Sequence, residues 1–121
     1  MTELTELEKN AVNRALSGAE DWKRQLREHV RQLLVLKREN TGAGFYTYFA
    51  LPKACAKAEV PADASSIPLE AYANHPKIPG GSFFLLWLKG GYIDFLEGAI
   101  GPEWSGVDTG FIFVDDKDKL R

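Results

Sequence analysis

Residues 82–96 have the sequence SFFLLWLKGGYIDFL and carry the clearest structural signal in the chain. Two runs of β-forming residues flank Gly90-Gly91, a pair that readily supplies the two positive-φ residues of a tight hairpin turn. Because a two-residue turn fixes how the strands pair, it also predicts which side chains share a face. We expect the helices of the protein to cover the face that carries Phe84, Leu86, Leu88, Ile93 and Phe95.

The opposite face of this hairpin is apolar as well. In the same register it carries Phe83, Leu85, Trp87, Tyr92, Asp94 and Leu96. An apolar surface of this kind is seldom left to water alone. We therefore expect this second face to be covered by another part of the chain or to bind something.

The first third of the chain predicts two helices. Thr5 and Glu8 have the spacing of a capping box, and apolar residues then recur at helical spacing until Ser17-Gly18. A second apolar stripe runs through Trp22, Leu26, Val30, Leu33 and Leu34.

After about residue 34 the apolar period changes from 3.6 toward 2, which is typical of strands. Strands are predicted at residues 34–39, 45–51 and 111–114 around the central hairpin, with a short extended piece at 69–73. Residues 1–121 are therefore expected to form a single α+β domain. Its two N-terminal helices would pack on a largely antiparallel sheet of four to six strands.

Composition narrows the class of protein. The 121 residues are 45% hydrophobic and 26% charged, which is typical of a globular domain. The single cysteine, Cys55, excludes a disulfide framework and fits a reducing compartment. No apolar run approaches the roughly 20 residues of a membrane span, and the acidic N-terminus is unlike a signal peptide. With a net charge of −2, we expect a cytoplasmic protein with no nucleic-acid or membrane partner.

Signatures of catalysis are sparse. His29 and His75 lack the spacing of metal ligands, and the better interpretation of His29 is a packed structural side chain. Cys55 lies in an alanine-rich loop, where an inert thiol is the simpler interpretation. The Gly42-Ala43-Gly44 stretch precedes an aromatic strand rather than a helix, so it predicts a turn and not a phosphate-binding loop. We expect no enzymatic activity, no cofactor and no metal.

Charge is distributed unevenly along the chain. Residues 90–116 contain six acids and no lysine or arginine, together with five aromatic residues. One interpretation is a solvated acidic rim. The other is a recognition surface for a basic protein, since aromatic anchors ringed by carboxylates suit such an interface. The candidate partner-binding residues are Asp94, Glu97, Glu103, Trp104, Asp108, Asp115 and Asp116.

Two segments, TGAGFYTYF at 41–49 and YIDFLEG at 92–98, resemble motifs of a family of short, single-domain cytosolic bacterial proteins with no assigned activity. In size, α+β pattern and local acidity the chain also resembles immunity proteins of bacterial toxin systems, including contact-dependent growth inhibition. The second resemblance implies a non-catalytic inhibitor that neutralises a basic, nuclease-like cognate toxin.

A small-ligand-binding or enzymatic domain that uses the sheet face around Trp87 and Tyr92 is the alternative function. A deep pocket over Trp87, Tyr92 and Asp94 would favour it. A flat or convex acidic surface centred on Glu103 and Trp104 would favour binding of a toxin instead.

Overall fold

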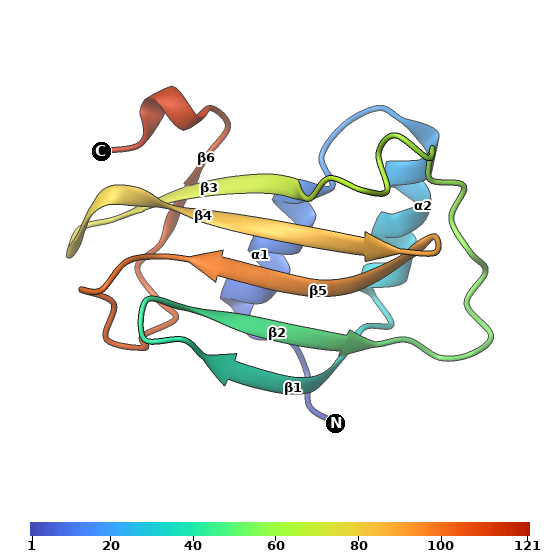
Figure 1. Cartoon of the computed structure of the whole chain (residues 1–121), viewed down its shortest axis with the longest axis horizontal. Coiled ribbons are helices and arrows are strands. Elements are labelled where there is room, and N and C mark those ends of the chain that lie inside the picture. The colour runs from blue at the N-terminus through green and yellow to red at the C-terminus, as the bar shows by residue number, and fades with distance from the viewer.

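The computed structural model describes all 121 residues. In chain order the elements are α1 (Glu6–Ala15), α2 (Asp21–Val30), β1 (Leu34–Asn40), β2 (Gly44–Ala50), β3 (Leu69–His75), β4 (Ile78–Lys89), β5 (Tyr92–Ala99), β6 (Ile112–Val114) and the short 3-10 helix η1 (Lys117–Lys119). All neighbouring strands are antiparallel, in one sheet of order β1-β2-β5-β4-β3-β6. Both helices lie on the same face of this sheet (Figure 1), which confirms the predicted α+β class.

Helix α1 begins at the predicted capping box. The Thr5 hydroxyl oxygen accepts a hydrogen bond from the Glu8 backbone N–H at 3.1 Å, and the Thr5 N–H donates to the Glu8 carboxylate at 2.8 Å. These two bonds satisfy backbone donors that a helix start otherwise leaves free. Neither helix is long and apolar enough to cross a membrane.

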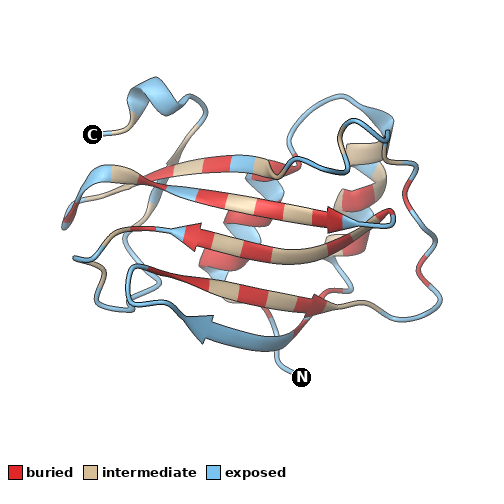
Figure 2. Ribbon diagram, in the orientation of Figure 1, coloured by how far each residue is buried: buried red, intermediate tan, exposed pale blue.

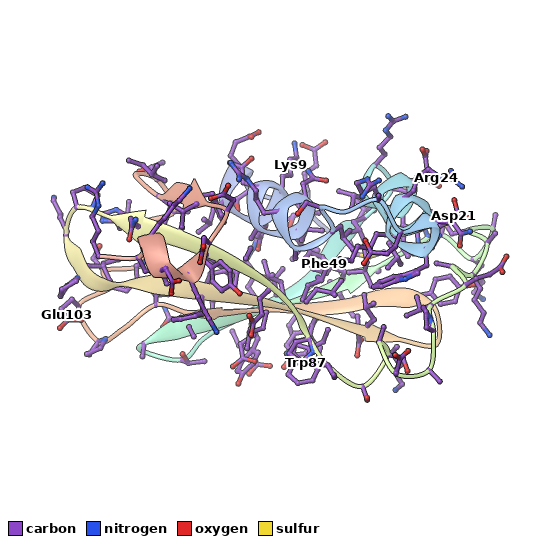
Figure 3. The ribbon with its side chains drawn as sticks, turned by 90° about the horizontal axis from the view of Figure 1, so that it is seen from above. Lys9, Asp21, Arg24, Phe49, Trp87 and Glu103 are labelled. Carbon is purple, nitrogen blue, oxygen red and sulfur yellow. The ribbon has the colours of Figure 1, made fainter.

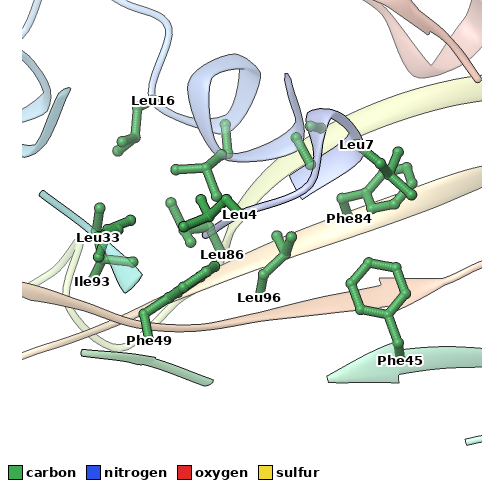
Figure 4. Close-up of a cluster of buried hydrophobic side chains, with 14 of the residues drawn as sticks. Leu4, Leu7, Leu16, Leu33, Phe45, Phe49, Phe84, Leu86, Ile93 and Leu96 are labelled. Carbon is green, nitrogen blue, oxygen red and sulfur yellow. The ribbon is translucent and has the colours of Figure 1, made fainter. Parts of the chain in front are cut away.

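The core lies between the helices and the sheet. Figure 2 shows buried and less buried residues alternating along the central strands, as expected when only one face of a sheet is covered. Leu16 and Leu26 on the helical side meet Phe84, Leu86 and Leu96 of the sheet, and all five are fully buried. Figure 4 shows part of this cluster from the side.

The central hairpin forms as predicted but contains a β-bulge. Lys89 pairs with Tyr92 across Gly90-Gly91, whose φ angles of 59° and 85° suit the turn. Leu88 then pairs with Ile93, whereas Trp87 pairs with Phe95, so Asp94 is left without a partner on β4.

The bulge exchanges two side chains between the faces. Leu96 is fully buried beside Leu86, although it was predicted on the outer face. The prediction that Phe95 faces the helices was wrong: it is half-buried and stacks on Trp87, on the other face. A turn fixes the register only as far as the first bulge, because one extra residue inverts every side chain beyond it.

No element covers the second face of the sheet. Figure 3 shows Phe49 pointing between the sheet and the helices and Trp87 on the opposite side, away from them. The protein therefore has two layers, and we call the uncovered side of the sheet the open face.

Candidate functional site

Aromatic side chains from three adjacent strands meet at the centre of the open face. Trp87 of β4 and Phe95 of β5 stack with ring centroids 5.9 Å apart and planes inclined by 16°. Tyr46 and Tyr48 of β2 approach Phe95 at 6.0 and 5.6 Å. We call these four residues the aromatic cluster. All four are half-buried, chiefly by one another and by their neighbours on the face.

Apolar surface continues from the aromatic cluster across the rest of the sheet. Tyr72 of β3 and Phe83 of β4 form an edge-to-face pair with centroids 5.5 Å apart. Phe83 is 37% exposed, and Ile112 on β6 is 66% exposed. Large contiguous apolar surfaces that stay in water usually mark a binding site. The open face therefore has the character of an interface.

Three carboxylates and one ammonium accompany these rings. Glu39 pairs with Lys37 at 3.0 Å, and Lys37 Nζ lies 5.1 Å from the centre of the Tyr48 ring. None of the structure's six ion pairs includes Glu97, whose Oε1 accepts a hydrogen bond from the indole N–H of Trp87 at 3.2 Å.

The third carboxylate is Glu70, which accepts a hydrogen bond from the Tyr72 hydroxyl at 2.5 Å. This bond to an anion favours the protonated phenol and, with partial burial, raises the pKa of Tyr72 to about 12. Among the charged side chains beside these rings, three carboxylates outnumber one ammonium, so this part of the open face carries a surplus of negative charge.

Glu97 also lines a shallow hollow of about 470 Å³ together with Tyr46, Phe83 and Ala99. The hollow lies where Ala99 of β5 pairs with Gly44 of β2, because neither residue has a side chain large enough to fill the surface there. A Cβ at Gly44 would lie only 1.7 Å from the Gly98 carbonyl oxygen, which restricts this position to glycine.

The predicted acidic residues do not gather on one surface. Asp94 and Glu97 lie on β5, while Glu103 lies at one end of the molecule in the loop after it (Figure 3). Asp115 pairs with Lys119 at 2.8 Å near the C-terminus, and Asp116 caps η1 by accepting from the Asp118 N–H. Of the seven predicted residues, Glu97 is the one placed beside the aromatic cluster.

Trp104 is held within the fold. Its ring lies 5.7 Å from that of Phe45, and its indole N–H donates to the Val107 carbonyl at 2.7 Å. With Asp108 and the helix-side residues Glu8 and Arg38 it lines a hollow of about 190 Å³. Much of its surface is therefore already used in packing, and it lies on the helix side of Phe45 rather than on the open face.

Trp87 and Tyr92, the centre of the alternative site, lie in different environments. Tyr92 stacks on His29 of α2 with centroids 5.7 Å apart, and its hydroxyl donates to the Cys55 carbonyl at 3.1 Å. The prediction that Tyr92 shares the outer face with Trp87 was therefore wrong. Trp87 lines none of the five main hollows of the surface.

The residues with catalytic potential make structural contacts. His29 is buried, as expected, and its Nε2 lies 2.7 Å from the Ala56 carbonyl. His75 Nε2 lies 3.0 Å from the Thr109 carbonyl, and Cys55 is buried. The structure contains no group of three or more histidine, cysteine or acidic side chains placed to hold a metal ion.

Sequence reasoning missed Tyr46 and Tyr48 as part of the site. Their signal is the alternation in FYTYF at 45–49, where Phe45, Thr47 and Phe49 are buried and the two tyrosines lie on the other face. No protein-family model, curated protein or solved structure matches this chain.

Proposed function

We propose that this chain is a non-catalytic protein-binding domain that binds a basic protein on its open face. The observation that carries the proposal is the aromatic cluster, whose four half-buried rings lie at the centre of a sheet face that no helix covers. Tyrosine and tryptophan are enriched among the residues that dominate interface energetics.

The shape of the open face supports a protein rather than a small molecule as the occupant. Small ligands are usually enclosed in deep clefts, whereas the hollow beside Glu97 is shallow. Six strands about 4.8 Å apart and about seven residues long cover roughly 24 by 23 Å in projection. This footprint is of the same order as the roughly 800 Å² that each partner buries in a standard interface.

Charge supports a basic partner. Glu39, Glu70 and Glu97 outnumber Lys37 on the open face, and Glu97 has no cation of its own. A second copy of the chain would bring like charges together, which opposes association. A positively charged surface of another protein would meet complementary charge on the open face, and its own apolar side chains could pack against the aromatic cluster.

Immunity-type inhibition is the specific form of this function that we propose. The basic active-site cleft of a nuclease-like toxin has the charge that the open face complements. An inhibitor of this kind acts in the cytoplasm, where a delivered toxin would reach nucleic acid. Binding alone is sufficient for such a role, so no catalytic residue is required.

The test is co-production of the chain with the product of a neighbouring gene, followed by growth measurements and titration of the purified pair. We expect protection of growth and an affinity that falls as ionic strength rises. Glu97→Lys should abolish protection, whereas Glu28→Lys, a charge reversal at an exposed position on α2, should preserve it. A partner bound equally well at all salt concentrations, or equal effects of the two substitutions, would contradict the proposal.

A further inference from the structure

The structure already holds one cation on the open face. Lys37 Nζ lies 5.1 Å from the centre of the Tyr48 ring and 3.0 Å from the Glu39 carboxylate. A cation within about 6 Å of a ring centre is attracted by the negative face of the ring. This internal pair shows the arrangement that the face offers to a cation, an aromatic ring beside a carboxylate.

The same arrangement recurs around Glu97, but without a cation. Tyr46 lies directly across from Glu97 on β2, and Phe83 lines the same hollow from β4. One oxygen of the carboxylate is held by the indole N–H of Trp87 at 3.2 Å, which fixes the orientation of the group. The other oxygen has no hydrogen-bond partner within the protein.

We infer that the hollow formed by Glu97, Tyr46, Phe83 and Ala99 is a receptor for an arginine side chain of the partner. The inference rests on the proposed function and names the group that the partner inserts. Ala99 leaves room for the side chain, Glu97 supplies the opposite charge, and the two rings contact the planar guanidinium. Arginine suits this site better than lysine, because its flat and weakly hydrated head group stacks on aromatic rings.

Binding of a cation in the hollow can be tested on the isolated protein, because the Trp87 indole N–H donates to Glu97 and its NMR signal should respond when Glu97 binds a cation. The chain has three tryptophans, so three indole N–H signals are expected in a ¹H–¹⁵N spectrum, and those of Trp22 and Trp104 serve as internal controls. The probe is methylguanidinium chloride at constant ionic strength, with neutral methylurea as the matched control. We expect saturable shifts of the Trp87 signal with methylguanidinium and none with methylurea.

Two substitutions test separately the charge of the hollow and the room that it offers to a ligand. Glu97→Gln keeps an oxygen for the Trp87 indole but removes the charge, and Ala99→Leu fills the hollow but keeps the charge. Each should weaken methylguanidinium binding at least about tenfold, equivalent to about 1.4 kcal/mol. Glu28→Gln, which removes an exposed carboxylate from α2 on the helical side of the sheet, should leave binding of the probe within about threefold of wild type.

The inference is overturned if methylurea shifts Trp87 as methylguanidinium does, if all three indoles respond alike, or if Glu97→Gln and Ala99→Leu bind normally. Tighter binding of methylammonium than of methylguanidinium would overturn the assignment to arginine. If a basic partner binds the open face but methylguanidinium does not bind in the hollow, this inference is refuted and the proposed function stands. If methylguanidinium binds in the hollow but the protein binds no basic partner, the proposed function is refuted instead.

Discussion

The Thr47 hydroxyl donates a 2.6 Å hydrogen bond to Glu8 Oε2, joining residues 39 positions apart in the chain. Arg38 of β1 binds the same carboxylate with two N–H groups, at 2.9 and 2.8 Å. Glu8 is 3% exposed, so these bonds compensate a charge that is removed from water. They also attach the start of α1 to the β1–β2 half of the sheet.

Replacing Arg38 with Met should destabilise the protein strongly. The substitution leaves the buried Glu8 carboxylate without its cation. Breaking a fully buried ion pair costs about 3–5 kcal/mol, and we expect a loss near the lower end of this range because the Arg38 side chain is 41% exposed. Urea denaturation measures the loss. Arg24→Met is the control: it removes an exposed pair with Asp21 and should cost less than about 1 kcal/mol. Equal losses in the two variants would show that Glu8 does not depend on Arg38.

The contribution of Glu8 should also depend on pH. Burial alone would raise its pKa, but hydrogen bonds from Arg38 and Thr47 outweigh burial and hold the pKa below its usual value of 4.5. A lowered folded-state pKa adds stability that is complete above the unfolded-state pKa and is lost as pH falls through the folded-state value. The difference in unfolding free energy between wild type and Arg38→Met should therefore shrink as pH falls from 7 to about 3. A constant difference across this range would contradict the prediction.

Two buried hydroxyls on the core face of the sheet should respond in opposite ways to removal. Ser82 Oγ is fully buried and has no hydrogen-bond partner, so Ser82→Ala should be neutral or stabilising by up to about 1 kcal/mol. Thr47→Val removes the bond to Glu8 and should cost about 1.5–3 kcal/mol. Denaturation midpoints of the two variants provide the comparison, and a larger loss for Ser82→Ala would refute it.

The β-bulge at Asp94 predicts the effects of two neighbouring substitutions. Leu96→Ala creates a cavity in the core and should cost about 2–5 kcal/mol. Phe95→Ala should cost clearly less, because this side chain is half-buried on the open face, yet it should weaken partner binding. If Phe95→Ala proves the more destabilising of the two, the bulge is misplaced, and the register predicted from the Gly90-Gly91 turn without a bulge is correct.

Local chemistry made part of this fold predictable. The Thr5 and Glu8 capping box and the Gly90-Gly91 turn depend on residues at most three positions apart, and both form as expected. The bulge at Asp94 depends on how β4 pairs with β5 along its whole length, which no short pattern encodes. Its consequence, the exchange of Phe95 and Leu96 between faces, could not be read from alternation.

The candidate site was harder to predict for a related reason. The acids between residues 90 and 116 are close in sequence, but the chain leaves the sheet after β5, so Glu103 and Asp108 lie away from Glu97. Tyr46 and Tyr48 were obscured because aromatic residues occupy both faces of β2. The structure shows which face of that strand enters the core, because Thr47 bonds to Glu8, which is remote in sequence, and Phe45 and Phe49 are buried beside it.

Hydroxyl-radical footprinting of the complex with the basic partner is the most direct test of the open face as its binding surface. We predict that partner binding protects the side chains of Tyr46, Tyr48, Trp87 and Phe95 from oxidation, while Trp22 on α2 reacts as it does in the free protein. Unchanged oxidation of Trp87 in a saturated complex, with protection on the helical side instead, would show that the partner does not bind the open face.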